Sequence, residues 1–146
     1  MNALEILKQD HQKVKELFQE ARRGEQNKRK DIFDKIDTEL EIHAHIEETV
    51  FYPALEEHEE LKDMVAEALE EHQEVKTLLE EIEELGPESH DFGARLQELM
   101  ENVEHHVEEE EGEMFPKVRE VFDEEELEEL GNQLNSAKGI QQREAV

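Results

Sequence analysis

Four histidines and two glutamates stand at positions where the surrounding pattern calls for an apolar side chain. Imidazole nitrogens and carboxylate oxygens are ligands that first-row transition metals accept in proteins, so this set is the first sign of chemistry in the chain. The six residues are His11, His43, Glu47, His72, His106 and Glu110. One histidine alone in such a position is usually a hydrogen-bonded core residue, and it is the set as a whole that predicts a site.

Two of the histidines are each followed by a glutamate four residues later, His43 by Glu47 and His106 by Glu110. Residues four apart lie on one face of a helix, so each pair can reach the same ion cluster. Burying the two carboxylates without partners would cost several kcal/mol each, and no cationic residue stands on these stripes to offset that cost. Two divalent ions would supply the missing charge. The alternative is a hydrogen-bonded network of histidine and glutamate with no metal.

The absence of cysteine narrows the kind of metal site. It excludes thiolate-ligated zinc and cysteine-ligated iron–sulfur clusters, and it leaves nitrogen and oxygen as the ligands. A site with more than four ligands and carboxylates that can bridge indicates a dinuclear centre. The high share of imidazole favours iron over manganese, and zinc stays an alternative because ligand type alone does not exclude it.

The elements that must position these residues are helices. Apolar residues recur every three or four positions over four segments, 4–21, 33–54, 61–82 and 92–114, and the short connections between them predict antiparallel neighbours. The fold class is therefore predicted as all-α, an up-down-up-down four-helix bundle, with a short fifth helix from Asp123 to about Asn135. At roughly 1.5 Å per residue, His11, His43 and His72 fall at about the same depth along the bundle, His106 about a turn lower, and each glutamate one turn beyond its own histidine.

Two parts of the chain resemble each other. Residues 10–18 parallel 71–79, and His43, Glu47 and Pro53 parallel His106, Glu110 and Pro116. An approximate two-fold axis is therefore expected to relate the first pair of helices to the second pair.

Length and charge limit the organisation and the partners. The 146 residues suit one domain, predicted over 1–135, followed by a flexible tail over 136–146. A formal net charge of -27 would repel nucleic acid and anionic membrane surfaces. With no leader sequence and no apolar run long enough to span a membrane, the expected location is cytoplasmic. The sequence leaves the oligomeric state open.

At this point the chain resembles the hemerythrin-like family, the HHE cation-binding domains. The resemblance covers roughly residues 1–135 and rests on Asp10-His11, His43 to Glu47 with Phe51-Tyr52-Pro53, Glu71-His72, and His106 to Glu110 with Phe115-Pro116. It implies two iron ions joined by an oxo or hydroxo bridge, acting on dioxygen, nitric oxide or peroxide. We expect the six residues above to be the metal ligands.

One residue departs from the family's oxygen carriers, which have a second histidine where this chain has Lys76. Two six-coordinate ions need about twelve positions, and the predicted ligands with one bridging oxygen leave about two of them open. Peroxide breakdown, nitric oxide binding or iron sensing suits such an open pair better than reversible oxygen carriage. Glu48 or Glu111 is a candidate for an additional ligand.

Two other functions stay open. One is a catalase-like or peroxidase-like diiron enzyme on the same site, and the other is a metal-free acidic helical module that docks a basic partner. Tyr52, the only tyrosine, is expected to pack at the rim of the site, with a ligand or radical role as the alternative. The remaining histidines lie off the stripes and are expected at the surface, namely His45, His58, His90 and His105.

Overall fold

The structure, a computed structural model, describes residues 1–24 and 26–144, and every regular element in them is helical. The prediction of an all-helical chain is confirmed for this part. The α-helices are α1 (Ala3–Arg23), α2 (Arg29–Ile46), α3 (Tyr52–Glu56), α4 (Lys62–Glu84), α5 (His90–Glu109), α6 (Phe115–Val121) and α7 (Glu124–Glu144). Two π-helical turns, Glu47–Phe51 and Glu110–Met114, join α2 to α3 and α5 to α6, and 3₁₀ turns at Gln26–Lys28 and Glu59–Leu61 lie in the connections.

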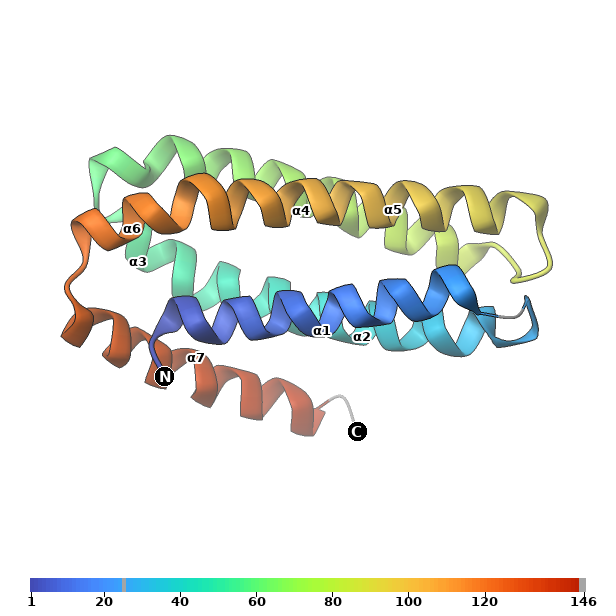
Figure 1. Cartoon of the computed structure of the whole chain (residues 1–146), viewed down its shortest axis with the longest axis horizontal. Coiled ribbons are helices and arrows are strands. Elements are labelled where there is room, and N and C mark those ends of the chain that lie inside the picture. The colour runs from blue at the N-terminus through green and yellow to red at the C-terminus, as the bar shows by residue number, and fades with distance from the viewer. Residues whose placement is uncertain (25, 145–146) are drawn as a thin grey trace.

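Four long rods lie side by side along the longest axis of the molecule (Figure 1). They are α1, α2 continued by α3, α4, and α5 continued by α6. The rod of α1 packs mainly on α2, and α4 packs mainly on α5, so the bundle consists of two helix pairs. No described helix is long and apolar enough to cross a membrane.

Capping side chains lie at the N-terminal ends of α1 and α7. The side chain of Asn2 accepts a hydrogen bond from the Glu5 backbone N–H, and the Glu5 carboxylate accepts one from the Asn2 backbone N–H. Asp123 and Glu126 make the same reciprocal pair of bonds at the start of α7. These bonds satisfy backbone N–H groups that the first turn of a helix leaves without partners.

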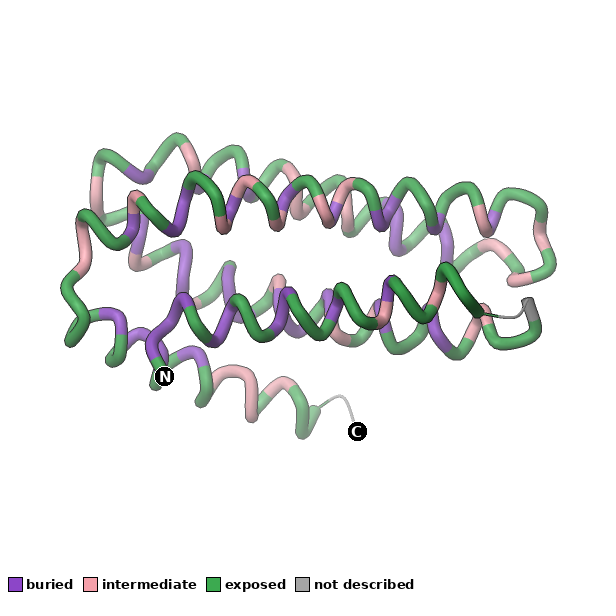
Figure 2. Tube along the Cα trace, viewed as in Figure 1, coloured by how far each residue is buried: buried purple, intermediate pink, exposed green. Residues whose placement is uncertain are grey.

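The core consists of two apolar clusters that lie toward opposite ends of the bundle. One contains Phe51, Tyr52, Leu55 and Phe115, and the other contains Phe18, Phe33, Phe92 and Leu99. Buried residues follow the inner faces of the rods in Figure 2. The polar residues discussed below form a layer between the two clusters.

The last helix is longer than the sequence predicts. The prediction that this helix ends at about Asn135 is wrong, because α7 continues to Glu144 through most of the expected tail over 136–146. Leu127, Leu130 and Leu134 are buried against the bundle, and Ala137 and Lys138 extend this contact by another turn. The contact lies mainly on α1 and α2, so one helix pair is covered by α7. Residues 145 and 146 lie outside the described part, and the domain boundary itself stays a prediction.

Candidate metal centre

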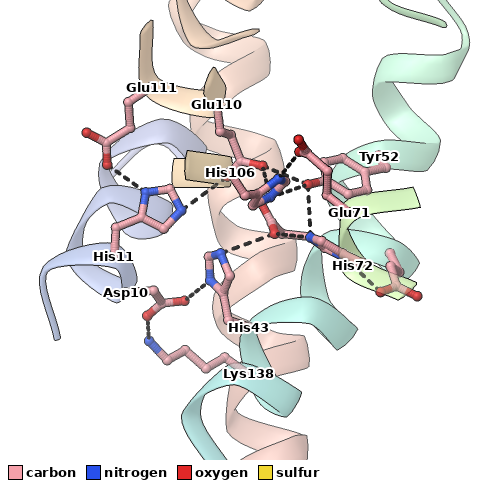
Figure 3. A network of polar contacts seen from close by, with 12 residues as sticks. Asp10, His11, His43, Tyr52, Glu71, His72, His106, Glu110, Glu111 and Lys138 are labelled. Carbon is pink, nitrogen blue, oxygen red and sulfur yellow. Dashed lines mark hydrogen bonds and ion pairs between the residues drawn. The ribbon is translucent and has the colours of Figure 1, made fainter. Parts of the chain in front are cut away.

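The structure brings the six predicted ligands together in one layer. Figure 3 labels all of them except Glu47. They come from α1, α2, α4, α5 and the two π-helical turns. Glu47 is 0% exposed and Glu110 is 1% exposed, so neither carboxylate reaches solvent. The imidazole side chains are nearly as well covered, at 10% exposure or less: His11, His43, His72 and His106.

The two glutamates each begin a π-helical turn, a feature that the sequence analysis did not predict. The Tyr52 N–H donates to the carbonyl of Glu47, and the Phe115 N–H donates to the carbonyl of Glu110, each five residues back. Pro53 and Pro116 follow directly, and a proline has no N–H for the bond that an α-helix would place there. In this wider turn, residues five apart lie on the same face of the helix. Tyr52 therefore shares the inward face with Glu47, and Phe115 shares it with Glu110, so both rings point into the core. Single π-turns of this kind are frequent at functional sites.

The Nε2 atoms of the four histidines converge on the carboxylates of Glu47 and Glu110. The Nε2–oxygen distances are 3.1 Å for His11 to Glu110, 3.1 Å for His43 to Glu47, 3.2 Å for His72 to Glu47 and 3.2 Å for His106 to Glu110. Five of the buried atoms in this layer have no hydrogen-bond partner: Nε2 of His11, Nε2 of His43, both carboxylate oxygens of Glu47, and Oε1 of Glu110. Buried polar atoms are nearly always hydrogen-bonded, so this concentration of unpaired nitrogen and oxygen atoms is what a cation site requires.

The donor atoms form two overlapping groups that could each hold an ion. One group is His11, His43, Glu47 and Glu110, and the other is Glu47, His72 and His106. Because Glu47 belongs to both, it can bridge two ions. The residues present therefore fit a pair of metal ions held by nitrogen and oxygen.

The Nδ1 atom of every histidine in the layer contacts a second carboxylate, which lies on the outer side of the ring; these four are called the outer carboxylates below. The Nδ1–oxygen distances are 2.6 Å for His11 to Glu111, 3.0 Å for His43 to Asp10, 2.8 Å for His72 to Glu48 and 2.6 Å for His106 to Glu71. A proton donated from Nδ1 to a carboxylate leaves the lone pair of Nε2 free to bind metal and fixes the direction of the ring.

These four carboxylates were not predicted in this role. Glu48 and Glu111 were candidates for additional ligands, and the structure instead places them behind His72 and His11. Sequence contains a signal for them, because Asp10-His11 repeats as Glu71-His72 and Glu47-Glu48 repeats as Glu110-Glu111.

The layer holds opposite charges when no cation is present. Burial alone would lower the pKa of His43, but the charge of the nearby Glu47 and the hydrogen bond to Asp10 outweigh it and hold that pKa well above its usual value. In the same way Glu110, with Glu47 and Glu71, raises the pKa of His106 to about 9. The pKa of Glu47 is well below its usual value because the charge of His43 and the close contacts with His43 and His72 outweigh burial. A metal ion must displace protons from these imidazoles, so its binding is coupled to pH.

Tyr52 lies inside the layer and is 0% exposed, so the expectation of packing at a rim is wrong. Its hydroxyl donates a hydrogen bond of 2.7 Å to Glu110, and it lies 3.3 Å from Nε2 of His72 and 3.5 Å from Nε2 of His106. Burial, together with the charges of Glu47 and Glu110, raises the pKa of Tyr52 well above its usual value. A cation among these atoms would reverse that effect and favour the phenolate. Lys76, by contrast, is exposed on α4.

The remaining histidines lie apart from the layer. His45, His90 and His105 are exposed, as predicted, whereas His58 is half-buried against the ring of Phe122 at a centroid distance of 4.8 Å. His105 also forms a third group of metal-ligand type with Glu71 and Glu109 at the surface. Glu71 is already bonded to His106 there, and exposed acidic groups of this kind are common without a metal.

A small cavity of about 40 Å³ lies against all four histidines of the layer. The rest of its lining is apolar: Val14, Leu40, Ala44, Val75, Val103 and Val107. Leu40, Ala44 and Val75 also line a groove of about 640 Å³ between α2 and α4. The cavity therefore has the size for a molecule of a few atoms, and His72 lines both it and this groove as well.

Comparison with known proteins gives matching results. The family model described as the hemerythrin HHE cation binding domain matches residues 2–118. The crystal structure of a hemerythrin HHE cation binding domain-containing protein from Mycobacterium kansasii is similar, with a TM-score of 0.88 and 30% identity, covering 99% of this chain and 90% of that one. A protein named DNA nickase from Nostoc sp. is 33% identical over 151 residues, covering 98% of this chain but only 41% of the nickase. This chain belongs to the family of hemerythrin HHE cation binding domains.

Proposed function

We propose that the chain binds two iron ions in the buried layer and uses them to bind, or react with, dioxygen, nitric oxide or peroxide. The observation that carries the proposal is the convergence of four Nε2 atoms on two buried carboxylates whose oxygens are largely unpaired. The proposed ligands are His11, His43, Glu47, His72, His106 and Glu110, and membership of a family of cation-binding domains supports a metal here. We also infer that the four rods run up, down, up and down, because their connections are short.

The donor set supports iron with an oxo or hydroxo bridge over the other candidates. Four imidazoles and two bridging carboxylates would supply about eight of roughly twelve positions, and the Tyr52 oxygen would supply another at the half of the site formed by His72 and His106. Zinc prefers four ligands in a closed tetrahedron, which fits a shared, ligand-rich layer less well. Manganese is the closer competitor, and metal analysis separates the two.

The cavity supports a small, uncharged ligand. Apart from the four imidazoles its walls are aliphatic, so a charged substrate would lose its hydration without compensation, and peroxide would find its polar contacts only on the side of the imidazoles and the bound ions. A bound iron pair supplies electrons and Lewis acidity to such a ligand. The chain itself lines the cavity with aliphatic side chains and fixes the imidazoles through the carboxylates at their Nδ1 atoms.

Peroxide turnover is the second candidate, and Tyr52 is the observation that favours it. Cleaving the O–O bond of peroxide requires a proton. Tyr52 supplies it when its oxygen is not an iron ligand, because the hydroxyl then keeps its proton among the ligand atoms of one half of the site. Oxygen evolution from added hydrogen peroxide measures this activity. Turnover in the iron-loaded wild type that is lost in Tyr52→Phe supports it, and equal rates in the two chains contradict this role for Tyr52.

The experiment that tests the main proposal uses two adjacent histidines. His106 is buried in the layer, while the side chain of His105 is 65% exposed. We expect about two irons per chain after anaerobic loading in the wild type and in His105→Gln, and a loss of at least one iron in His106→Gln. Absorption spectra taken before and after addition of oxygen, nitric oxide and peroxide then identify the ligand. Equal iron content in the two variants would contradict the assignment of the site.

The chain's partners are proposed from its charge. A net charge of -27 opposes binding to nucleic acid or to an anionic membrane. The chain covers only 41% of the relative named DNA nickase, so we do not extend that activity to this chain. A cytoplasmic location stays a proposal. If the wild type holds less than about one metal ion per chain, the alternative of an acidic docking module is favoured.

A further inference from the structure

The internal repeat allows the two halves of the centre to be compared residue by residue. His43 has its counterpart in His106, and their Nδ1 atoms meet corresponding carboxylates, Asp10 and Glu71. His11 and His72 correspond in the same way and meet Glu111 and Glu48. Each half therefore has two histidines, each supported by one carboxylate.

The symmetry ends behind Asp10. One carboxylate oxygen of Asp10 contacts His43, and the other pairs with the ammonium group of Lys138 (Figure 3). Asp10 is 5% exposed, so this ion pair is largely shielded from water. In the described part of the chain no lysine or arginine pairs with the corresponding Glu71, whose near neighbours are His105 and the acidic Glu109.

Lys138 belongs to α7, and this helix follows the segment that the family model matches, residues 2–118. Several contacts hold α7 in place. The Asn2 side chain donates to Glu124, and Gly131 lies so close to residues 1–3 that a Cβ atom there would be 2.5 Å from the Met1 carbonyl oxygen. The lysine is thus presented to the centre by a fixed element.

We infer that Lys138 is a positioning residue that makes the two metal positions unequal by cancelling the charge of Asp10. The inference rests on the proposed iron pair. The ion held by His11 and His43 would have behind its histidines one carboxylate without a lysine or arginine ion pair, Glu111, and the charges of Lys8 and Lys15 act on that carboxylate from nearby. The ion held by His72 and His106 would have two, Glu48 and Glu71, and would have the Tyr52 oxygen beside it.

This difference in charge has a direct redox consequence. Nearby negative charge stabilises Fe³⁺ relative to Fe²⁺, and the effect is large in a buried site because screening is weak. In each half, Fe³⁺ takes up one electron from an added reductant such as dithionite and becomes Fe²⁺. The ion beside His43 is therefore the first to be reduced, at the higher of two midpoint potentials.

The test is a redox titration of the iron-loaded full-length chain, followed by its absorption spectrum. In Lys138→Met the charge of Asp10 is no longer cancelled, so we expect the higher midpoint potential to fall toward the lower one while the lower one changes less. In the double variant Lys138→Met/Asp10→Asn the charge balance is restored and an acceptor for His43 is kept, so the higher potential should return toward its wild-type value. A lysine that only anchored α7 would give no such recovery.

The matched control is Arg143→Gln, which removes one positive charge from an exposed position on the same helix. We expect it to leave both potentials unchanged. Iron content measured first in every chain separates the two proposals: a wild type without two irons overturns the proposed function and this inference with it. With two irons present, an unchanged higher potential in Lys138→Met, or no recovery in the double variant, overturns the inference alone.

Discussion

Each imidazole of the centre is held at Nδ1 by a carboxylate, and its Nε2 atom faces Glu47 or Glu110 at 3.1–3.2 Å. The sequence predicts which histidines face inward, because a polar residue on an apolar stripe stands out. It did not lead us to the outer carboxylates, because Glu48 and Glu111 lie in acidic runs that are otherwise typical of a solvated face. Tyr52 was misplaced because straight α-helical spacing directs it away from Glu47, and only the π-turn directs it inward.

The raised pKa values of the histidines predict how the metal-free chain responds to pH. A group whose pKa is higher in the folded state stabilises that state fully below its unfolded value of about 6.5, and this stabilisation is lost as pH rises through the folded value. His106, with a pKa of about 9, is such a group. We therefore expect the free energy of unfolding of the metal-free chain to fall between about pH 6.5 and 9, measured by urea denaturation.

The same experiment has an internal control. His106→Gln should lose part of the pH dependence, whereas replacement of the exposed His105 should keep it. With zinc as a redox-inactive ion the trend should weaken or reverse, since metal binding releases the protons. A metal-free chain that gains stability over this pH range would contradict the charges assigned to the layer.

Visible absorption tests whether the Tyr52 oxygen binds iron. It is the only tyrosine, so a visible band from phenolate bound to Fe³⁺ can have no other origin in this chain. We expect such a band in the oxidised iron-loaded wild type and its loss in Tyr52→Phe, with both irons retained. An identical spectrum in the variant would show that the phenol oxygen does not bind iron.

At the scale of elements, the helices and their apolar stripes are predictable, but their ends and irregularities are not. Pro53 and Pro116 indicate a disturbance, yet a sequence does not show that the chain accommodates it with a wide turn rather than a bend or an end. The length of α7 was underestimated because Lys138, Gly139 and the residues after them have few apolar side chains. A contact with the buried Asp10, rather than hydrophobic periodicity, extends that helix over the bundle.

The close contact between α7 and α1 gives a prediction for a pair of glycines. A Cβ atom on Gly131 would meet backbone atoms of residues 1–3, whereas one on Gly139 would meet nothing within 4 Å. We expect Gly131→Ala to lower the free energy of unfolding by about 1–3 kcal/mol, as overpacking does. Gly139→Ala should instead raise it by up to about 1 kcal/mol through helix propensity. Equal effects would contradict the described contact of α7 with the N-terminus.

The route to the cavity gives a further prediction. Ala44 lines both the cavity and the groove between α2 and α4, so a larger side chain there narrows the passage. We expect Ala44→Leu to slow nitric oxide binding several-fold in stopped-flow measurements while iron content stays the same. The exposed Ala66 on α4 serves as the control, and Ala66→Leu should bind at the wild-type rate. An unchanged rate in Ala44→Leu would place the route elsewhere.

At the scale of the whole molecule, two helix pairs repeat one unit around a shared polar layer, and α7 covers only one of them. The repeat and the family membership follow from sequence, because the matching motifs are close copies of one another. The inequality of the halves does not follow from sequence. It depends on Tyr52 lying beside His72 where its counterpart Phe115 lies beside His11, and on the ion pair of Lys138 with Asp10.

The most direct test of the account is anomalous diffraction at the iron absorption edge from crystals of the iron-loaded chain. The account predicts two peaks roughly 3.5 Å apart in the layer that contains the Nε2 atoms of the four histidines, with Glu47 within reach of both peaks. No peak in this layer, or iron only at the surface group of Glu71, His105 and Glu109, would contradict it.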